Sequence, residues 1–389
     1  MYSAMRPCAV SLSARRLRLH PPSLSPFSVL SSLPLSRAQS SPRKVKHCFC
    51  RFASTTKSFF NPHPIYSFVQ QPLPKGSRLK SSLDKYYVIG EVLKERPVAG
   101  KIWCVYRATH EGKQFIIKDT NPFDFDYRVS LQKHVERSPH VRTAVDSIPE
   151  RHMFVFPYLE KCLIDVDIDA LSSVTKKAII RDALTGLADL HDKKILHTDM
   201  NPTNIALDSF KQQNGDLGWR NVQIIDLDLA VVIPPKSKGL GDLLTGNHWW
   251  RSPEAWARGI QNTPSDIYTF ALAAIYVWTG HIVLYTDKAY HASPEEQKKL
   301  ILTRHLSFFI STPEDLKGFV KYHGENVPFL QCTLEIFNSF SDENPRAPFG
   351  GWQQLDPQFR DLICKMTCLD PLRRITAREA LQHPWFAAE

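Results

Sequence analysis

The stretch His191–Ile205 reads HDKKILHTDMNPTNI and places three polar side chains at fixed intervals. His197, Asp199 and Asn204 have the spacing H-x-D-x-x-x-x-N, directly after a segment whose apolar residues recur with a helical period. Asp226 follows further on, after an apolar run that is typical of a buried strand. Mg²⁺ takes oxygen ligands and usually accepts only one or two of them from protein. An asparagine and an aspartate on adjoining loops therefore predict a site for this cation.

A lysine lies upstream, at the end of another apolar run. Lys118 directly follows the residues Phe115-Ile-Ile, which predict a strand. A lysine at this point of a strand can reach an anion bound at the face of the sheet. By itself this pattern is typical of an ordinary strand end. It indicates a functional lysine only because it precedes the polar loop residues in the chain.

The pattern of apolar residues changes along the chain from strand-forming to helix-forming. Short β-branched and aromatic runs predict strands at 86–93, 102–108 and 114–118. Helical spacing begins near Ser172, and later helices are expected at 265–277, 358–366 and 376–381. Strands first and helices later, with no internal repeat, predict an α+β protein with a sheet-rich small lobe and a helical large lobe.

Taken together, these residues resemble the eukaryotic protein kinases over about residues 86–386, and most closely the divergent serine/threonine kinase-like proteins of filamentous fungi. The resemblance implies a two-lobed kinase fold, ATP and Mg²⁺ as cofactors, and transfer of the γ-phosphoryl group to Ser/Thr hydroxyls of a protein substrate. It implies that Lys118 holds the ATP phosphates and that Asp199 is the base for the substrate hydroxyl. It also implies that Asn204, counted with these two as catalytic, binds Mg²⁺ together with Asp226.

Further positions match the same family. Gly100 is the one glycine retained in the loop expected to cover the phosphates. The gatekeeper and hinge of the nucleotide site are expected at Phe156, Pro157, Tyr158 and Leu159. Structural matches are Ser252-Pro-Glu254 for the A-P-E motif, Asp266 for the helix aspartate that fixes the catalytic loop, and Arg374 for the arginine that pairs with Glu254.

Several positions depart from the family pattern. The other two loop glycines are replaced by Val98 and Trp103, which restricts how closely the backbone can approach phosphates. The helix expected at 126–135 offers no glutamate to pair with Lys118. Three more substitutions surround the catalytic motifs: Asn201 for a lysine, Asp228 for a glycine and Asn247 for a threonine. Asn201 and Asn247 together suggest one polar contact rebuilt with amides.

These departures leave alternatives to an active protein serine/threonine kinase. A pseudokinase would bind partners or nucleotide without turnover. A small-molecule kinase would share the H-x-D-x-x-x-x-N loop, but that class lacks the pairing of the A-P-E glutamate with a late arginine. Asn201 stands in place of the catalytic-loop lysine, so the sequence does not decide whether Ser/Thr or Tyr hydroxyls of the substrate are preferred.

The net charge of +10 belongs to the N-terminal part of the chain. Residues 1–83 hold 13 Lys/Arg, 17 Ser and 10 Pro and no acidic residue, whereas the remainder carries 36 basic against 39 acidic side chains. We therefore predict a disordered basic tail at 1–83, a kinase domain at 84–386 (small lobe about 84–158, large lobe about 159–386), and no nucleic-acid partner for the folded domain.

The first twenty residues are Arg-rich, acid-free and amphipathic, which is typical of a mitochondrial presequence. Two other interpretations remain. The segment is a disordered tail on a protein of the cytoplasm or nucleus, or the start site is assigned too far upstream. Eight scattered cysteines fit a reducing compartment. The longest apolar stretch, 270–285, is interrupted by Thr-Gly-His and predicts a core helix rather than a membrane span. The sequence is silent on the oligomeric state and on the identity of the protein substrate.

Overall fold

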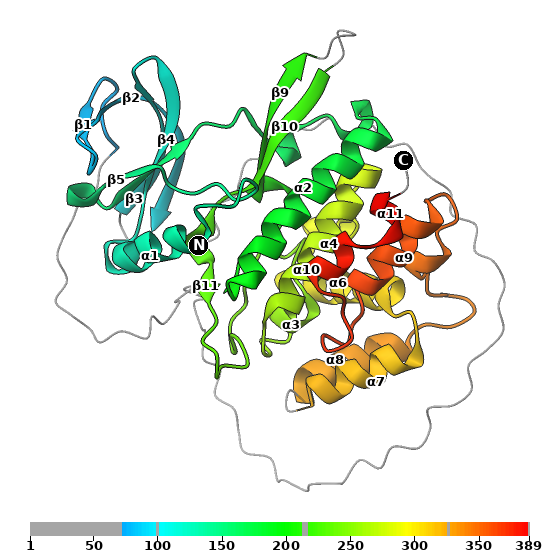
Figure 1. The fold of residues 1–389 in the computed structure, drawn as a ribbon. Helices are drawn as coiled ribbons and strands as arrows, with labels where there is room; N and C mark the ends of the chain where they lie inside the picture. The colour runs from blue at the N-terminus through cyan, green and yellow to red at the C-terminus, as the bar shows by residue number, and fades with distance from the viewer. Residues whose placement is uncertain (1–71, 99–100, 212–216, 325–326, 388–389) are drawn as a thin grey trace, which may run out of the picture. The chain divides into compact units, whose positions relative to one another are not determined.

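The computed structural model describes residues 72–98, 101–211, 217–324 and 327–387 of the 389-residue chain. All of them belong to one compact unit, Phe68–Glu389. Within this unit the earlier strands form a sheet-rich lobe, and the helices that follow form a second, helical lobe (Figure 1). The predicted α+β architecture with two lobes is confirmed.

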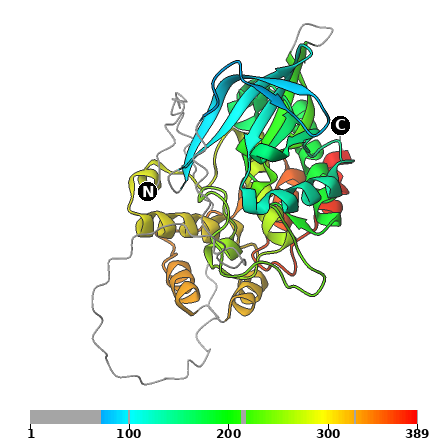
Figure 2. The same cartoon turned by 90° about the vertical axis from the view of Figure 1, so that its left-hand side faces the viewer.

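The sheet-rich lobe is built on a six-stranded sheet, which Figure 2 shows face-on in blue and cyan. Its strand order is β1-β2-β3-β4-β6-β5, and every neighbouring pair is antiparallel. The strands are β1 (Arg78–Lys80), β2 (Tyr86–Val98), β3 (Lys101–His110), β4 (Lys113–Asp119), β5 (Asp146–Ile148) and β6 (Met153–Pro157).

Alternation along β4 and β6 divides the side chains between the two faces of this sheet. Ile117 and Val155 are paired in register and belong to one buried cluster. Ile116 belongs to the cluster on the opposite face, which α1 (Phe125–Val135) covers. Because Lys118 is two residues beyond Ile116, its side chain lies on the same face as α1.

The first strand lies in a segment that was predicted to be part of the tail. Leu79 in β1 is only 5 % exposed and pairs with Tyr87 in β2. This strand has one apolar residue and no alternation of its own, so its order comes from its partner strand. The predicted boundary at residue 84 is therefore placed too late, and the sheet begins before it. The tail prediction for residues 1–71 lies outside the described residues.

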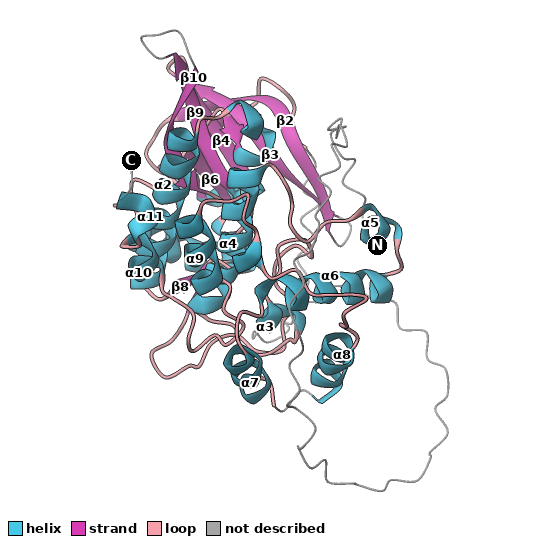
Figure 3. Ribbon diagram, turned by 90° about the vertical axis from the view of Figure 1, so that its right-hand side faces the viewer, coloured by secondary structure: helices cyan, strands magenta, loops and turns pink. Residues whose placement is uncertain are grey.

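The helical lobe follows the sheet (Figure 3). It contains most of the largest of the three buried apolar clusters among the described residues. Helices near 265–277, 358–366 and 376–381 were predicted, whereas no element was assigned to residues 294–338, which contain three helices. The helices are α2 (Ser173–Asp192), α3 (Pro253–Trp256), α4 (Thr263–Thr279), α5 (Asp287–His291), α6 (Pro294–Phe309), α7 (Pro313–Tyr322), α8 (Val327–Asn338), α9 (Pro357–Met366), α10 (Ala377–Leu381) and α11 (Pro384–Ala387). No helix in these described ranges is long and apolar enough to cross a bilayer.

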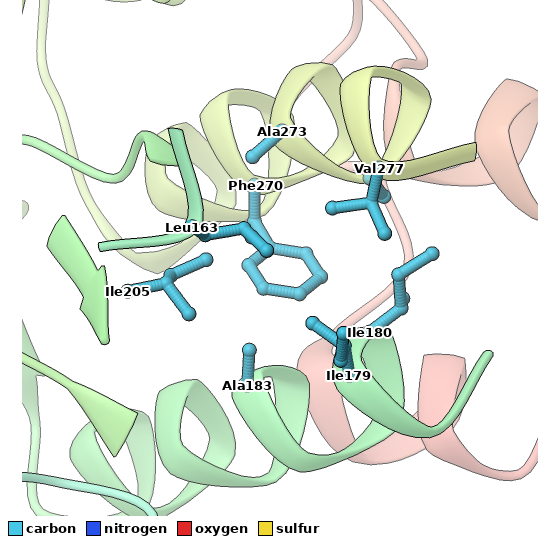
Figure 4. Close-up of a pocket in the computed structure, with 9 residues that line it drawn as sticks. Leu163, Ile179, Ile180, Ala183, Ile205, Phe270, Ala273 and Val277 are labelled. Carbon is cyan, nitrogen blue, oxygen red and sulfur yellow. The ribbon is translucent and has the colours of Figure 1, made fainter. Parts of the chain in front are cut away.

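The centre of the helical lobe is the contact between α2 and α4. Side chains of the two helices point toward one another around a void of about 10 Å³ (Figure 4). The void is small and lined by apolar side chains, so a water inside it would find no hydrogen-bond partner. It is therefore a packing defect rather than a binding site. The residues around it are Leu163, Ile179, Ile180, Ala183, Ile205, Phe270, Ala273, Ala274 and Val277.

Small two- and three-stranded sheets fix the loops between these helices. β8 (Ile195–Leu196) pairs with β11 (Val231–Val232), which joins the start of the H-x-D loop to the segment after Asp226. A second sheet has the order β10-β9-β7, with β7 at Lys161–Cys162, β9 at Ile205–Lys211 and β10 at Leu217–Ile224. Since β9 follows Asn204 and β10 precedes Asp226, this sheet holds the two predicted metal ligands side by side.

Candidate active site

An aspartate of α4 holds the H-x-D loop by hydrogen bonds to its backbone. Asp266 is 2 % exposed and accepts hydrogen bonds from the backbone N–H groups of His197 (2.7 Å) and Thr198 (2.9 Å). Thr198 has a left-handed backbone with φ of 71°, a conformation that costs free energy unless the surroundings enforce it. The predicted role of Asp266 in fixing the loop is confirmed by these contacts.

His197 links the loop to the strand that carries Asp226. Its side chain is fully buried, and its Nε2 lies 3.1 Å from the carbonyl oxygen of Ile225. Its Nδ1 accepts a hydrogen bond from the backbone N–H of Asp199 at 3.3 Å. These two contacts fit the neutral imidazole with its proton on Nε2. The histidine therefore sets the distance between the two aspartates through backbone contacts.

The Asp199 carboxylate is held by three N–H donors. Its Oδ1 accepts from Asn201 Nδ2 (3.1 Å) and from the backbone N–H of Asn247 (3.2 Å), and its Oδ2 accepts from Asn204 Nδ2 (3.1 Å). Burial raises the pKa of Asp199, and its interaction with His197 and the hydrogen bonds from Asn247 and Asn204 only partly offset the effect. The result is a fixed carboxylate whose pKa lies above that of an ordinary aspartate.

The two asparagines noted in the sequence both contact this carboxylate, but in different ways. Asn201 reaches it with its side-chain amide and also caps the next turn by accepting from the N–H of Thr203 at 2.9 Å. Asn247 uses only its backbone N–H, and its side-chain oxygen accepts from Trp249 N–H at 3.0 Å. The contact is therefore rebuilt with one amide side chain rather than two.

Lys118 reaches across to the loop that carries Asp226. Its Nζ lies 2.6 Å from Asp226 Oδ1 and 2.8 Å from Asp228 Oδ2. Burial lowers the pKa of this ammonium, but the two carboxylates outweigh burial and raise it. Burial likewise raises the pKa of Asp226, yet the charge and hydrogen bond of Lys118 prevail and lower it to about 2. Both groups are therefore charged at neutral pH.

The remaining oxygens near Asp226 fit a hard cation. Among the described residues, Asn204 Oδ1 and Asp226 Oδ2 accept no hydrogen bond, while Asn204 Nδ2 is fully used on Asp199. The carbonyl oxygen of Asn204 accepts from Ile225 N–H at 2.9 Å, which places the two candidate ligands next to each other. An amide oxygen and an ionised carboxylate are the donor types that Mg²⁺ prefers.

The expected hinge leads out of the last central strand of the sheet. Phe156 is buried in the cluster beneath α1, and Pro157 ends β6 opposite Phe115. Tyr158 is partly buried against the same cluster. Leu159 continues the chain toward the helical lobe. Gly100 lies outside the described residues, so its predicted contact with phosphates stays a prediction.

Two residues of the site were missed by the sequence reasoning. Arg142 places its guanidinium 5.2 Å from the ring centroid of Phe156; burial lowers its pKa to about 10, although the charge of Asp226 opposes this. Asp228 was noted only as a missing glycine, whereas it is a partner of Lys118. The signal for this partner was the helix expected at 126–135, which has no glutamate to pair with Lys118, because a buried lysine needs a carboxylate partner.

A lysine on the sheet, an aspartate held by amides and a second aspartate beside an asparagine are the kinds of residue that phosphoryl transfer uses. Residues 100–386 match the protein kinase domain, and the chain belongs to this family. The resemblance predicted from the sequence is thereby confirmed.

Curated relatives support the same assignment at low identity. The chain is similar to the mitogen-activated protein kinase pmk-3 of Caenorhabditis elegans, with 26 % identity over 213 residues, which cover 54 % of this chain and 40 % of the relative. It is also similar to the serine/threonine-protein kinase/endoribonuclease ire-1 of the same organism, with 24 % identity over 296 residues, or 72 % of this chain and 25 % of the relative. The chain thus spans less than half the length of each of these relatives.

Proposed function

We propose that the chain is an active protein kinase that transfers the γ-phosphoryl group of ATP to Ser or Thr hydroxyls of a protein substrate. The observation that carries this proposal is the Asp199 carboxylate, which three N–H donors hold beside the pair formed by Lys118 and Asp226. Such a fixed base and a fixed cation are what phosphoryl transfer requires, since its catalysis consists mostly of positioning and electrostatic stabilisation.

Each residue of the site has one role in this proposal. Asn204 and Asp226 would hold Mg²⁺, which when bound supplies positive charge to the phosphate oxygens. Lys118 binds and orients the ATP phosphates. Asp199 accepts the proton of the substrate hydroxyl, and its raised pKa brings it closer to the operating pH of a general base.

Asn201 is a neutral replacement for a lysine in this mechanism. Its amide keeps Asp199 oriented by a 3.1 Å hydrogen bond but brings no charge to the phosphates. Because orientation is maintained, we expect proton acceptance to survive, with less stabilisation of charge on the transferred group than a lysine would give. Preference for Ser/Thr over Tyr rests on the family resemblance and on the names of the relatives, one of which is a serine/threonine-protein kinase.

A pseudokinase is the second candidate, and one observation favours it. The carboxylates of Asp226 and Asp228 are both paired with Lys118. Nucleotide phosphates must therefore compete with these carboxylates for the ammonium. The match of residues 100–386 to the protein kinase domain makes a small-molecule kinase the weaker alternative.

The test is transfer of label from γ-³²P-ATP by the full chain, with Mg²⁺, to casein and to a basic protein substrate, followed by phosphoamino-acid analysis. We expect labelled phosphoserine or phosphothreonine. Label confined to phosphotyrosine would overturn the Ser/Thr assignment. ATP binding without any transfer would support the pseudokinase instead.

A further inference from the structure

Lys118 is shared by two carboxylates of a single turn. Its side chain is 18 % exposed, and its Nζ contacts Asp226 Oδ1 at 2.6 Å and Asp228 Oδ2 at 2.8 Å. The two aspartates are separated only by Leu227, which is buried in the largest apolar cluster. The lysine is therefore tied to the same turn that carries the candidate metal ligand.

The backbone explains how both carboxylates reach one ammonium. Asp226 has a left-handed backbone (φ 67°, ψ 64°), and a 3₁₀ turn follows at Leu227–Leu229. Asp228 lies inside this turn and is not among the residues with positive φ, so a side chain is accommodated there without strain. The sharp turn brings side chains i and i+2 to the same side.

Helix α1 offers no competing carboxylate. Its one acidic residue is Asp126, which is exposed in the first turn, and no ion pair joins α1 to Lys118 in the described part of the chain. Instead α1 supplies a cation: Arg128 Nη1 donates to the carbonyl oxygens of Leu227 (3.2 Å) and Ala230 (2.5 Å). The helix holds the backbone of the turn, and the turn holds the lysine.

We propose that Asp228 is a positioning residue that retains Lys118 at the nucleotide site and thereby leaves Asp226 available to a metal ion. This inference rests on the proposed nucleotide site. If Asp228 were neutral, Asp226 would be the sole remaining carboxylate partner of Lys118 among the described residues, and the ammonium would compete with Mg²⁺ for it. With Asp228 present, Lys118 can release Asp226 and keep one charged partner.

The proposal predicts a defect in metal dependence rather than in folding. The melting temperature of the full chain is measured at fixed ATP while the Mg²⁺ concentration is varied. We expect Asp228→Asn to raise the Mg²⁺ concentration at half-maximal stabilisation by about tenfold, the loss of one charge-assisted contact. For Asp228→Glu, which keeps the charge, the Mg²⁺ concentration at half-maximal stabilisation should remain within about threefold of the parent's. The control Asp126→Asn, which neutralises an exposed acid, should have the same value as the parent.

A double-mutant cycle separates positioning from direct metal binding. In a Lys118→Met background, Asp228→Asn should shift the Mg²⁺ midpoint by less than about twofold, because the ammonium that competes is gone. An equal shift in both backgrounds would mean that Asp228 binds the metal itself and would overturn the proposal.

The same measurement distinguishes failure of the inference from failure of the proposed function. If Mg²⁺ and ATP stabilise the parent but Asp228→Asn has the parent's midpoint, the inference alone is wrong. If the parent is not stabilised at any Mg²⁺ concentration, the proposed nucleotide site is wrong and the inference falls with it. The melting temperature without nucleotide serves as the check that each variant is folded.

Discussion

Glu254 and Arg374 form a two-contact ion pair in the interior of the helical lobe, although they are 120 residues apart in the sequence. Arg374 Nη2 lies 2.7 Å from Glu254 Oε1 and Nη1 lies 3.2 Å from Oε2. The two side chains are 0 % and 1 % exposed. The arginine also donates to the carbonyl oxygens of Pro264 and Cys368, so it joins the start of α4 to the C-terminal helices. The pair predicted from the sequence is confirmed.

Removing this arginine should destabilise the domain strongly. Arg374→Met leaves the Glu254 carboxylate buried without its charged partner, and breaking such a pair costs about 3–5 kcal/mol. Thermal or urea unfolding of the full chain measures this loss. The matched control is Arg258→Met, because Arg258 pairs with Asp242 on the surface at 3.7 Å and exposed pairs contribute about 0–1 kcal/mol. Equal stability of the two variants would show that the buried pair does not support the lobe.

Nucleotide should bind where Lys118, Asn204 and Asp226 meet. Saturating MgATP is expected to stabilise the folded chain by about 2.7 kcal/mol at a hundredfold excess over Kd. Asp226→Asn should remove most of the Mg²⁺ dependence of this shift, because it replaces the charged oxygen ligand by a neutral amide. Asp342→Asn, an exposed change far along the sequence, is the control. A parent that shows no shift at millimolar MgATP contradicts the site.

The pH profile of phosphoryl transfer should reflect the environment of Asp199. Only the ionised carboxylate can accept a proton, and burial raises its pKa, so the rate should fall on acidification with a midpoint above about 3.9, the ordinary aspartate value. Asp226, whose pKa is lowered to about 2, stays ionised throughout and does not produce this limb. The measurement is kcat/KM between pH 4 and 8, with the melting temperature followed at each pH. A rate that does not fall between pH 8 and pH 4 would contradict the assignment.

Activity should not depend on phosphorylation of the segment between Asp226 and Glu254. Gln261 contacts this segment through Leu243 O (2.7 Å) and the Thr245 hydroxyl, and Arg251 donates to Thr245 O (2.7 Å). These contacts order the segment without a phosphate. Phosphatase treatment should therefore leave the rate within about a factor of two.

A matched variant completes this test. Ser237→Ala removes an exposed hydroxyl of the segment whose only described contacts are local, with Gly239. A tenfold loss of rate after phosphatase treatment or in this variant would show that a phosphate is needed.

The parts of the fold that could be predicted are those with strong local signals. The loop beginning at His197 has a fixed spacing of polar residues, and α2 and α4 have long apolar periodicities. The strand β1 could not be predicted, because Leu79 is its one apolar residue and its order depends on a partner strand. The helices at 294–338 were missed since no family motif falls on them.

In the site, the sequence predicted which residues meet but not how they pair. The order of Lys118, Asp199 and Asp226 was readable, whereas the pairing of Lys118 with Asp228 depends on a left-handed residue and a 3₁₀ turn. The lack of a glutamate in α1 to pair with Lys118 indicated that another carboxylate was needed. It could not indicate which of the neighbouring acids the backbone would bring within 3 Å.

The central claim, that Asp199 is the base of an active kinase, is tested most directly by the ratio of kcat between the parent and Asp199→Asn. Asparagine keeps the size of the side chain but cannot accept the proton, so kcat should fall by about 10² to 10⁴. The thermal shift with MgATP, measured on the same samples, should be little changed. Equal kcat values for the two proteins, or no transfer by the parent despite bound MgATP, would contradict the account.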